Sequence, residues 1–122
     1  MNELQFQSKL IAKIRSGLPG SVVFKHSDRL TIGIPDISVS WVGMTSWWEL
    51  KVASPNIKAR GVQTKVIQDL ARVTECHYVI FSDDRTYIVI PREIDAWKES
   101  PNQTEGINFD FVVAFVLQVH GA

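Results

Sequence analysis

The sequence predicts an α/β fold in which a central mixed β-sheet is flanked by helices, with the core elements in the order αβββαβ. Apolar and polar residues alternate along residues 37–41 and 46–52, on either side of a short turn, which is typical of a β-hairpin. Along residues 3–16 and 58–74 apolar residues instead recur every three or four positions, which is typical of amphipathic helices. The chain has 122 residues, of which 45% are hydrophobic, so we expect residues 1–122 to form a single domain around one core.

The N-terminal part is expected to form a helix over residues 3–16, which Gly17 and Pro19 bring to an end. Residues 21–25 follow as the first strand. The apolar stripe of the helix is expected to consist of Leu4, Leu10, Ile11 and Ile14.

The next two strands form the hairpin, with a turn expected at residues 42–45. If Gly43 and Met44 are at the centre of this turn, Asp36 lies opposite Lys51 and diagonal to Glu49. Because side chains alternate between the two faces of a strand, one face is polar and the other is expected to pack on the core. The polar face carries Asp36, Ser38, Ser40, Glu49 and Lys51, and the apolar face carries Ile37, Val39, Trp41, Trp48, Leu50 and Val52.

The second half begins with a loop at 54–57 and the helix at 58–74. The apolar face of this helix is expected to consist of Val62, Val66, Leu70 and Val73. Beyond it we expect strands at 77–82 and 86–90, a short helix at 91–97, a mobile loop at 100–106 and, at 109–119, a last strand or a segment that faces a partner.

The charges are divided unevenly along the chain. The formal net charge is zero, which by itself argues against a nucleic-acid partner. Residues 1–72, however, hold ten Lys or Arg and five Asp or Glu, whereas residues 73–122 hold three and eight. The first part of the chain is therefore basic enough to bind DNA.

The single cysteine, Cys76, excludes an internal disulfide and a cysteine-rich zinc site, and is expected to be a small buried residue. The N-terminus has no early apolar block of the kind that signal peptides contain. The apolar segment at 109–119 is too short and too polar to span a bilayer. We therefore expect a cytoplasmic protein, in a bacterium or a phage-infected host; its small size is compatible with a phage origin.

The polar face of the hairpin brings together two carboxylates and an amine, Asp36, Glu49 and Lys51. Carboxylate oxygens are the ligands that Mg²⁺ prefers, and a lysine can orient a water molecule, stabilise a developing negative charge or act as a base. This set of groups is typical of a metal-dependent phosphodiesterase. The structural alternative is an exposed ion pair between two strands, which would contribute a few tenths of a kcal/mol.

The segments Gly33-Ile34-Pro35-Asp36 and Glu49-Leu50-Lys51 resemble the signature of the PD-(D/E)XK nuclease superfamily. With Gln63 downstream on a helix, residues 1–80 are most similar to the VRR-type nucleases and the Holliday-junction resolvases related to them. The resemblance implies a restriction-endonuclease-like fold and DNA cleavage with Mg²⁺ or Mn²⁺. It also implies that Asp36, Glu49, the backbone carbonyl of Leu50 and a glutamate of the first helix, here Glu3, bind the metal.

Two of these positions have structural alternatives. Glu3 lies near the terminus, where a frayed helix would disorder it, and it is also a favourable charge at a helix N-terminus. Gln63 either points toward the site, where it contacts a phosphate or Lys51, or is an ordinary exposed glutamine. The catalytic residues expected on this basis are Asp36, Glu49, Lys51 and Gln63.

Contacts with DNA phosphates require positive charge without base-specific geometry. His26 is expected to border the site or, alternatively, to form a structural hydrogen bond with Asp28. The expected DNA-binding residues are Lys25, His26, Arg29, Lys58, Arg60 and Lys65.

The expected function is a metal-dependent DNA endonuclease that selects branched DNA. The alternative is a catalytically inactive module of the same fold that binds DNA or another partner. Because one small domain offers little surface for a DNA junction, we expect a homodimer, with the apolar segment at 109–119 and Trp97 at the interface.

Overall fold

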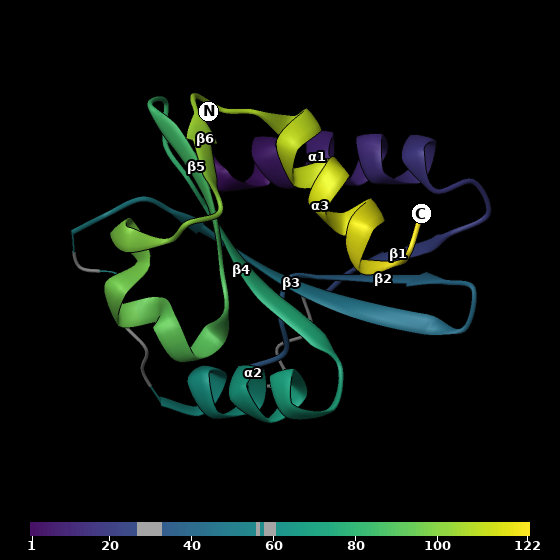
Figure 1. The fold of residues 1–122 in the computed structure, drawn as a ribbon, viewed down its shortest axis with the longest axis horizontal. Coiled ribbons are helices and arrows are strands. Elements are labelled where there is room, and N and C mark those ends of the chain that lie inside the picture. Colours follow the sequence, from purple (N-terminus) through teal and green to yellow (C-terminus); the bar gives the residue numbers. More distant parts are fainter. Residues whose placement is uncertain (27–32, 56, 58–60) are drawn as a thin grey trace.

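The structure, a computed structural model, describes residues 1–26, 33–55, 57 and 61–122, with the backbone alone for residues 61–63 (Figure 1). The elements are α1 (Glu3–Gly17), β1 (Val22–Lys25), β2 (Ile37–Trp41), β3 (Met44–Val52), α2 (Gly61–Val73), β4 (Glu75–Phe81), β5 (Arg85–Val89), the 3₁₀ helix η1 (Pro91–Glu99), β6 (Gln103–Glu105) and α3 (Phe109–Val119).

The described strands form one six-stranded sheet in the order β1-β2-β3-β4-β5-β6. Strands β3 and β4 are parallel, and all other neighbours are antiparallel. A parallel pair needs a long crossover, which α2 provides between β3 and β4. The sheet is therefore mixed and flanked by helices, which confirms the predicted α/β class.

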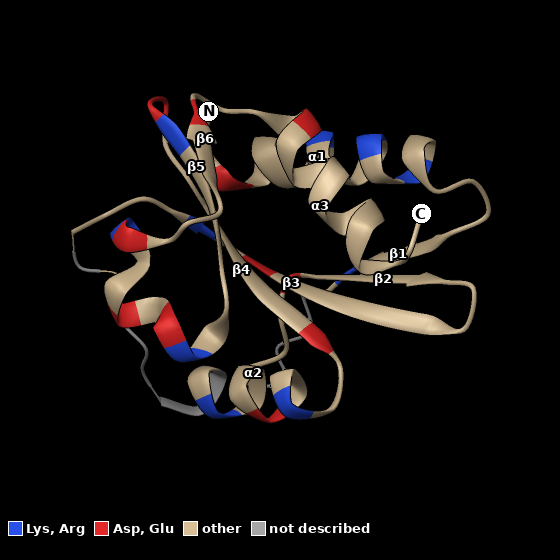
Figure 2. Cartoon of the chain, viewed as in Figure 1, with Lys and Arg blue, Asp and Glu red and all other residues tan. Residues whose placement is uncertain are grey.

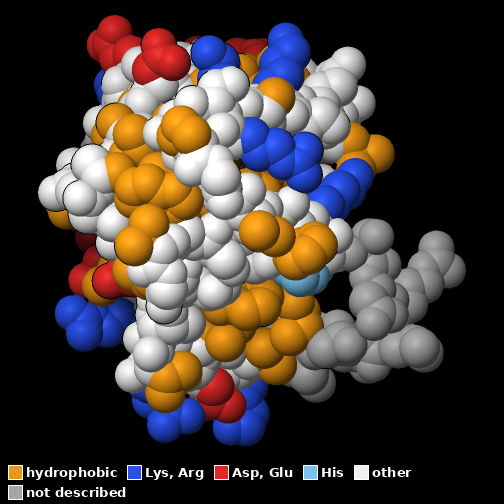
Figure 3. All heavy atoms as spheres, turned by 90° about the vertical axis from the view of Figure 1, so that its right-hand side faces the viewer, with side chains coloured by type: hydrophobic (Ala, Val, Ile, Leu, Met, Phe, Trp, Pro, Cys, Tyr) orange, Lys and Arg blue, Asp and Glu red, His pale blue; other side chains and the backbone are white. Residues whose placement is uncertain are grey.

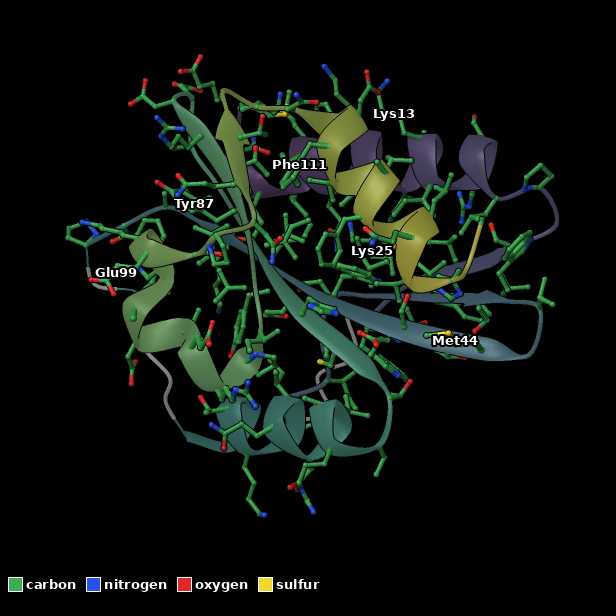
Figure 4. All side chains as sticks on the ribbon, viewed as in Figure 1. Lys13, Lys25, Met44, Tyr87, Glu99 and Phe111 are labelled. Carbon is green, nitrogen blue, oxygen red and sulfur yellow. The ribbon has the colours of Figure 1, made fainter. Side chains whose placement is uncertain are left out.

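Helices cover both faces of the sheet (Figure 1). Helices α1 and α3 pack on one face, around a core that includes Phe6, Ile14, Val39, Leu50 and Val116. Helices α2 and η1 pack on the other, around Ile67, Cys76, Tyr78, Ile80 and Trp97. Figure 4 shows Lys13 on α1 and Phe111 on α3, the two helices on the first face. The apolar side of the predicted hairpin does face the core, except that Val52 at its end is exposed.

The turn of the hairpin is shorter than the sequence predicted. Trp41 pairs with Met44, so the turn consists of Val42 and Gly43 alone, with φ angles of 48° and 77°. Two consecutive positive φ angles match the twist of a two-residue hairpin, although a β-branched residue such as valine adopts them with strain. The register is shifted by two residues, so the expectation that Asp36 lies opposite Lys51 was wrong. A shift of two residues leaves every side chain on its predicted face.

The C-terminal segment is a helix and not a strand. Asn108 begins α3 by accepting a hydrogen bond from the N–H of Phe111 at 3.0 Å. Val112 and Val116, one helical turn apart, are completely buried. The high content of β-branched and aromatic residues had favoured a strand, but the contacts with α1 and the sheet favour the helix.

Three other expectations were wrong in detail. The predicted loop at 100–106 contains the short edge strand β6, which pairs with β5. Trp97 is buried against Tyr87, with ring centroids 5.0 Å apart, and is not available as a dimer interface. In the two predicted apolar stripes, Leu4 and Val73 are exposed, and Phe6 and Ile67 occupy the buried positions instead.

Candidate active site

The strand pairing brings His26, Asp36 and Glu49 into one row across the ends of β1, β2 and β3. Ile37 pairs with Lys25 on β1 and with Trp48 on β3. If both pairings continue by one residue, Asp36 lies opposite His26 on one side and opposite Glu49 on the other. The N–H of His26 donates to the carbonyl of Asp36 at 2.7 Å, which extends the first ladder to this row. On β4, Tyr78 is the partner of Glu49. We call His26, Asp36 and Glu49 the carboxylate row.

Each of the two carboxyl groups accepts a hydrogen bond from a backbone N–H of the neighbouring strand. The N–H of Asp36 donates to Oε1 of Glu49 at 3.1 Å, and the N–H of Leu50 donates to Oδ2 of Asp36 at 2.8 Å. A further hydrogen bond joins the two side chains. Glu49 is almost completely buried, with a relative exposure of 2%. Both carboxyl groups therefore converge on one point, with little freedom to move.

Lys51 forms an ion pair with Glu49, which is on the same strand. The sequence had predicted that Lys51 lies opposite Asp36 on the neighbouring strand. Its Nζ lies 3.3 Å from Oε2 of Glu49, and its side chain is partly open to solvent. The two residues are two positions apart on β3, so their side chains leave the same face of the sheet. An ion pair with a buried partner differs from the exposed pair that was the structural alternative.

Burial raises the pKa of Glu49 to about 8, and the negative charge of Asp36 raises it further than the positive charge of Lys51 lowers it. In the absence of a cation the pair therefore holds a proton at neutral pH. A divalent cation bound between the two groups would replace that proton and favour both ionised forms. The donor set thus fits a hard cation such as Mg²⁺.

The backbone carbonyl of Leu50 lies on the same side as Asp36. In a β-strand the N–H and C=O of one residue point to the same neighbouring strand, and the N–H of Leu50 points to Asp36. The residue opposite Leu50 in this register is Pro35. Proline has no N–H, so Pro35 cannot donate to the Leu50 carbonyl. The Leu50 carbonyl oxygen therefore points to the side of β3 on which Asp36 lies.

Glu3 lies near this group at the start of α1. Its pKa is raised by partial burial and by the charge of Asp36, and is lowered by Lys51, so its carboxyl group lies within range of both charges. Asn2 caps the helix by accepting from the N–H of Gln5 at 2.8 Å, which holds the first turn in place against fraying. Among the described residues, no three or more His, Cys, Asp or Glu side chains are arranged to hold a metal ion. Glu3 is therefore near the carboxyl pair without completing a three-residue site.

The other expected site residues are placed as follows. His26 bonds through Nε2 to Oγ of Ser38 at 2.7 Å. Lys25 is exposed at the end of β1, and Lys65 on α2 forms an ion pair with Asp69. Gln63 lies in the first turn of α2, but its side chain is outside the described part. Arg29, Lys58 and Arg60, and the predicted partner Asp28, also lie outside the described residues.

A separate pocket of about 670 Å³ lies where α2, β4 and η1 meet, with Arg72, Cys76 and Arg92 in its wall. Asp36, Glu49 and Lys51 do not line it. Burial raises the pKa of the Cys76 thiol to about 12, so this cysteine is an unreactive thiol at neutral pH, as expected for a small buried residue. The titratable groups with the arrangement of a candidate active site are therefore the carboxyl pair and not the residues that line this pocket.

Three aromatic residues near the carboxyl pair were not identified as site residues from the sequence. Tyr78 lies beside Glu49, and burial together with that carboxyl group raises its pKa to about 12. Phe24 and Trp47 lie one row away, on either side of Ser38. The alternation that assigned Asp36 and Glu49 to one face also assigns Trp47 to it, so part of this group could have been found.

Comparisons with known proteins support the fold. No protein-family model matches the chain, and no curated protein matches it in sequence. Among solved structures it is similar to Hjc, a Holliday junction resolvase from the archaeal hyperthermophile Archaeoglobus fulgidus, with a TM-score of 0.54 over 73% of this chain and 72% of that chain. The two sequences are 12% identical, so the likeness concerns the fold. It agrees with the predicted restriction-endonuclease-like architecture.

Proposed function

We propose that this protein is a metal-dependent nuclease that hydrolyses phosphodiester bonds in DNA. The observation that carries the proposal is the convergence of half-buried Asp36 and buried Glu49, whose carboxyl groups accept backbone hydrogen bonds and are adjoined by Lys51. A fold similar to that of a Holliday junction resolvase supports it. Branched DNA is the substrate that this similarity favours.

In this proposal Asp36, Glu49 and the Leu50 carbonyl hold Mg²⁺ or Mn²⁺. The bound cation supplies two things that the reaction needs: a lower pKa for the attacking water and positive charge beside the phosphoryl oxygens. Glu49, whose pKa burial raises to about 8, would give up its proton if a cation bound there. The backbone N–H groups of Asp36 and Leu50 then keep the carboxylate oxygens in position.

Lys51 is partly exposed at the edge of the pair, where a phosphate can approach it. Its ammonium group stabilises the charge that develops on the phosphate or orients the water molecule. Glu3, in the first turn of α1, is proposed to orient the water molecule or to contribute to the cation site. Gln63 lies in the first turn of α2 and is proposed to contact the phosphate or Lys51.

A branched DNA molecule presents two strands for cleavage, whereas the described part of one chain contains one carboxyl pair of this kind. We therefore propose that two copies act together as a homodimer. The molecular mass in solution, measured by light scattering with and without branched DNA, distinguishes a monomer from a dimer. A monomer under both conditions would contradict this part of the proposal.

The proposed activity is tested by incubating the purified protein with linear, nicked, flap and four-way DNA in Mg²⁺, Mn²⁺ or EDTA. We expect cleavage with either metal, none in EDTA, and a preference for the branched substrates. Binding without cleavage under every condition would identify the protein as a DNA-binding module instead. Equal cleavage of all four substrates would support a nuclease but contradict selectivity for branched DNA.

A further inference from the structure

A group of aromatic side chains lies next to the carboxylate row on the same face of the sheet. It shares one member, His26, with that row. The strand pairing places Phe24 opposite Ser38, and Ser38 opposite Trp47. The ring of His26 lies close to both aromatic residues, with its centroid 6.3 Å from that of Phe24 and 5.4 Å from that of Trp47. The three rings thus form a continuous surface, which we call the aromatic row (Phe24, His26 and Trp47).

The aromatic row is open to solvent at the end that β1 provides. On this side of the sheet the described helices α2 and η1 pack on β4 and β5, and not on the edge strand β1 (Figure 1). Phe24 keeps 58% of its surface exposed. Figure 3, which views the molecule from the side of the β2–β3 turn, shows hydrophobic side chains gathered around a histidine. A contiguous apolar surface of this kind marks a binding site more often than a single exposed residue does.

The spacing relates the aromatic row to the proposed reaction. Phe24 and Trp47 are each two residues away from the carboxylate row along their strands, which corresponds to about 7 Å. The histidine ring is fixed in this position, because Nε2 bonds to Oγ of Ser38 and the backbone N–H bonds to the Asp36 carbonyl. A nucleotide whose phosphate lies at Asp36 and Glu49 can therefore place a neighbouring base on the rings.

We propose that the aromatic row stacks on the base of an unpaired nucleotide next to the cleaved bond, so that the substrate is DNA with a splayed or single-stranded segment at the cut. This inference rests on the proposed nuclease function. Within a duplex both faces of a base are covered by its neighbours, whereas an unpaired base has a free face for an aromatic side chain.

The other occupant of such a surface would be a protein, because β1 is an edge strand that another strand can extend. Two observations favour a base. The surface consists of flat rings, and it continues directly into the carboxylate row. A partner strand bound through β1 would need the backbone edge of that strand and would not need the Phe24 ring.

The test compares Phe24 variants in DNA binding without metal, so that cleavage plays no part. The probe is a duplex that contains 2-aminopurine within a short unpaired segment, and the control probe is the same sequence fully paired. Phe24→Tyr keeps the aromatic ring, Phe24→Leu keeps an apolar side chain without it, and Phe24→Ala removes both. Val22→Ala is the matched control, because Val22 is exposed on the same strand and face. Circular dichroism verifies that each variant is folded.

We expect Phe24→Ala and Phe24→Leu to weaken binding of the unpaired probe by about 5- to 100-fold and to abolish quenching of 2-aminopurine, with little change for the duplex. Phe24→Tyr and Val22→Ala should bind as the wild type does. Full affinity in Phe24→Leu, an equal loss on both probes, or a change in oligomeric mass in place of DNA affinity would overturn the inference. Cleavage by the wild type is measured separately, so its absence would contradict the proposed nuclease function while leaving the binding result interpretable.

Discussion

The carboxyl group of Glu49 is buried between Asp36 and Lys51, which is an unusual environment for an acidic side chain. Its pKa is raised from 4.5 to about 8 in the folded chain. Between these two values the folded protein keeps a proton that the unfolded chain has released. The contribution of Glu49 to stability is therefore complete below about pH 4.5 and is lost as the pH rises toward 8.

We expect the free energy of unfolding in EDTA to fall between pH 5 and 8 by a few kcal/mol more in the wild type than in Glu49→Gln, at about 1.4 kcal/mol for each unit of pKa shift. The amide in Glu49→Gln is uncharged throughout, so this decline should disappear. Calorimetric melting at a series of pH values measures the difference. Parallel curves for the two proteins would show that Glu49 titrates normally. Added Mg²⁺ should reduce the decline in the wild type, because the cation stabilises the ionised pair.

Lys51 is predicted to act on the substrate and not to hold the cation. Lys51→Ala should lose most of the nuclease activity, because the ammonium group beside the phosphate is removed, while calorimetric titration still detects Mn²⁺ binding. Lys13→Ala is the control, since Lys13 pairs with Asp110 on the outside of α1 and α3. Loss of Mn²⁺ binding in Lys51→Ala would instead identify Lys51 as a structural partner of Glu49.

Glu3 has two possible roles, which one substitution separates. If its carboxylate acts in the site, Glu3→Gln should lower the cleavage rate by orders of magnitude and leave the melting temperature nearly unchanged, because the amide keeps the shape but loses the charge. If Glu3 acts only as a charge at the start of α1, the variant should lose about 0.3 to 1 kcal/mol of stability and keep its rate. The rate and the melting temperature are measured on the same preparation.

At the scale of the elements, the hairpin β2–β3 determines which groups meet. The residue types of the site could be predicted from the sequence, since alternation assigns Asp36, Glu49 and Lys51 to one face in any register that differs by two residues. The contact between Asp36 and Glu49 could not be predicted, because it depends on a turn at Val42 and Gly43. Valine is an unusual residue for a positive φ angle, so the pattern favoured the longer turn.

This turn provides a prediction about stability. Val42→Asn should raise the free energy of unfolding by about 1 kcal/mol, because Asn-Gly is a preferred pair for a hairpin turn with two positive φ angles. The melting temperature should rise by about 3 to 6 °C in a domain of this size. Gly43→Ala, at a φ angle of 77°, should lower it. An unchanged or lower melting temperature in Val42→Asn would contradict the two-residue turn.

The C-terminal elements show where sequence patterns are insufficient. Nearly every position of α3 is apolar, so neither the helical nor the strand period stands out, and the buried pair Val112 and Val116 becomes apparent only in contact with α1 and the sheet. Strand β6 consists of Gln103, Thr104 and Glu105, which have no apolar pattern at all. These residues form a strand because they pair with β5, and no pattern within residues 103–105 indicates that pairing.

At the scale of the whole molecule, the described helices cover the two faces of the sheet unequally. Helices α1 and α3 cover one face, while α2 and η1 cover β4 and β5 on the other, with the carboxylate row at the boundary (Figure 1). Figure 2 shows acidic positions on η1 and toward the β5–β6 end of the sheet, and basic positions along α1. None of the described helices is long and apolar enough to cross a membrane.

The charge distribution is consistent with a DNA partner despite the net charge of zero. The excess of positive charge belongs to residues 1–72, which include β1 to β3 and the carboxyl pair. In the proposed function, positive charge in this part of the chain would favour contact with a phosphate backbone. In the proposed function, a cation held by the carboxyl pair would remove the repulsion between these carboxylates and a phosphate.

The measurement that tests the central claim most directly is DNA cleavage by Asp36→Ala beside the wild type, with DNA binding measured in parallel. Asp83→Ala is the matched control, because Asp83 is an exposed carboxylate in the β4–β5 turn. We expect Asp36→Ala to lose cleavage of branched DNA in Mg²⁺ and Mn²⁺ while binding DNA as tightly as the wild type or more tightly, since one repulsive charge is removed. Asp83→Ala should cleave normally. Metal-dependent cleavage by Asp36→Ala at a rate near that of the wild type would contradict the assignment of the carboxyl pair as the active site.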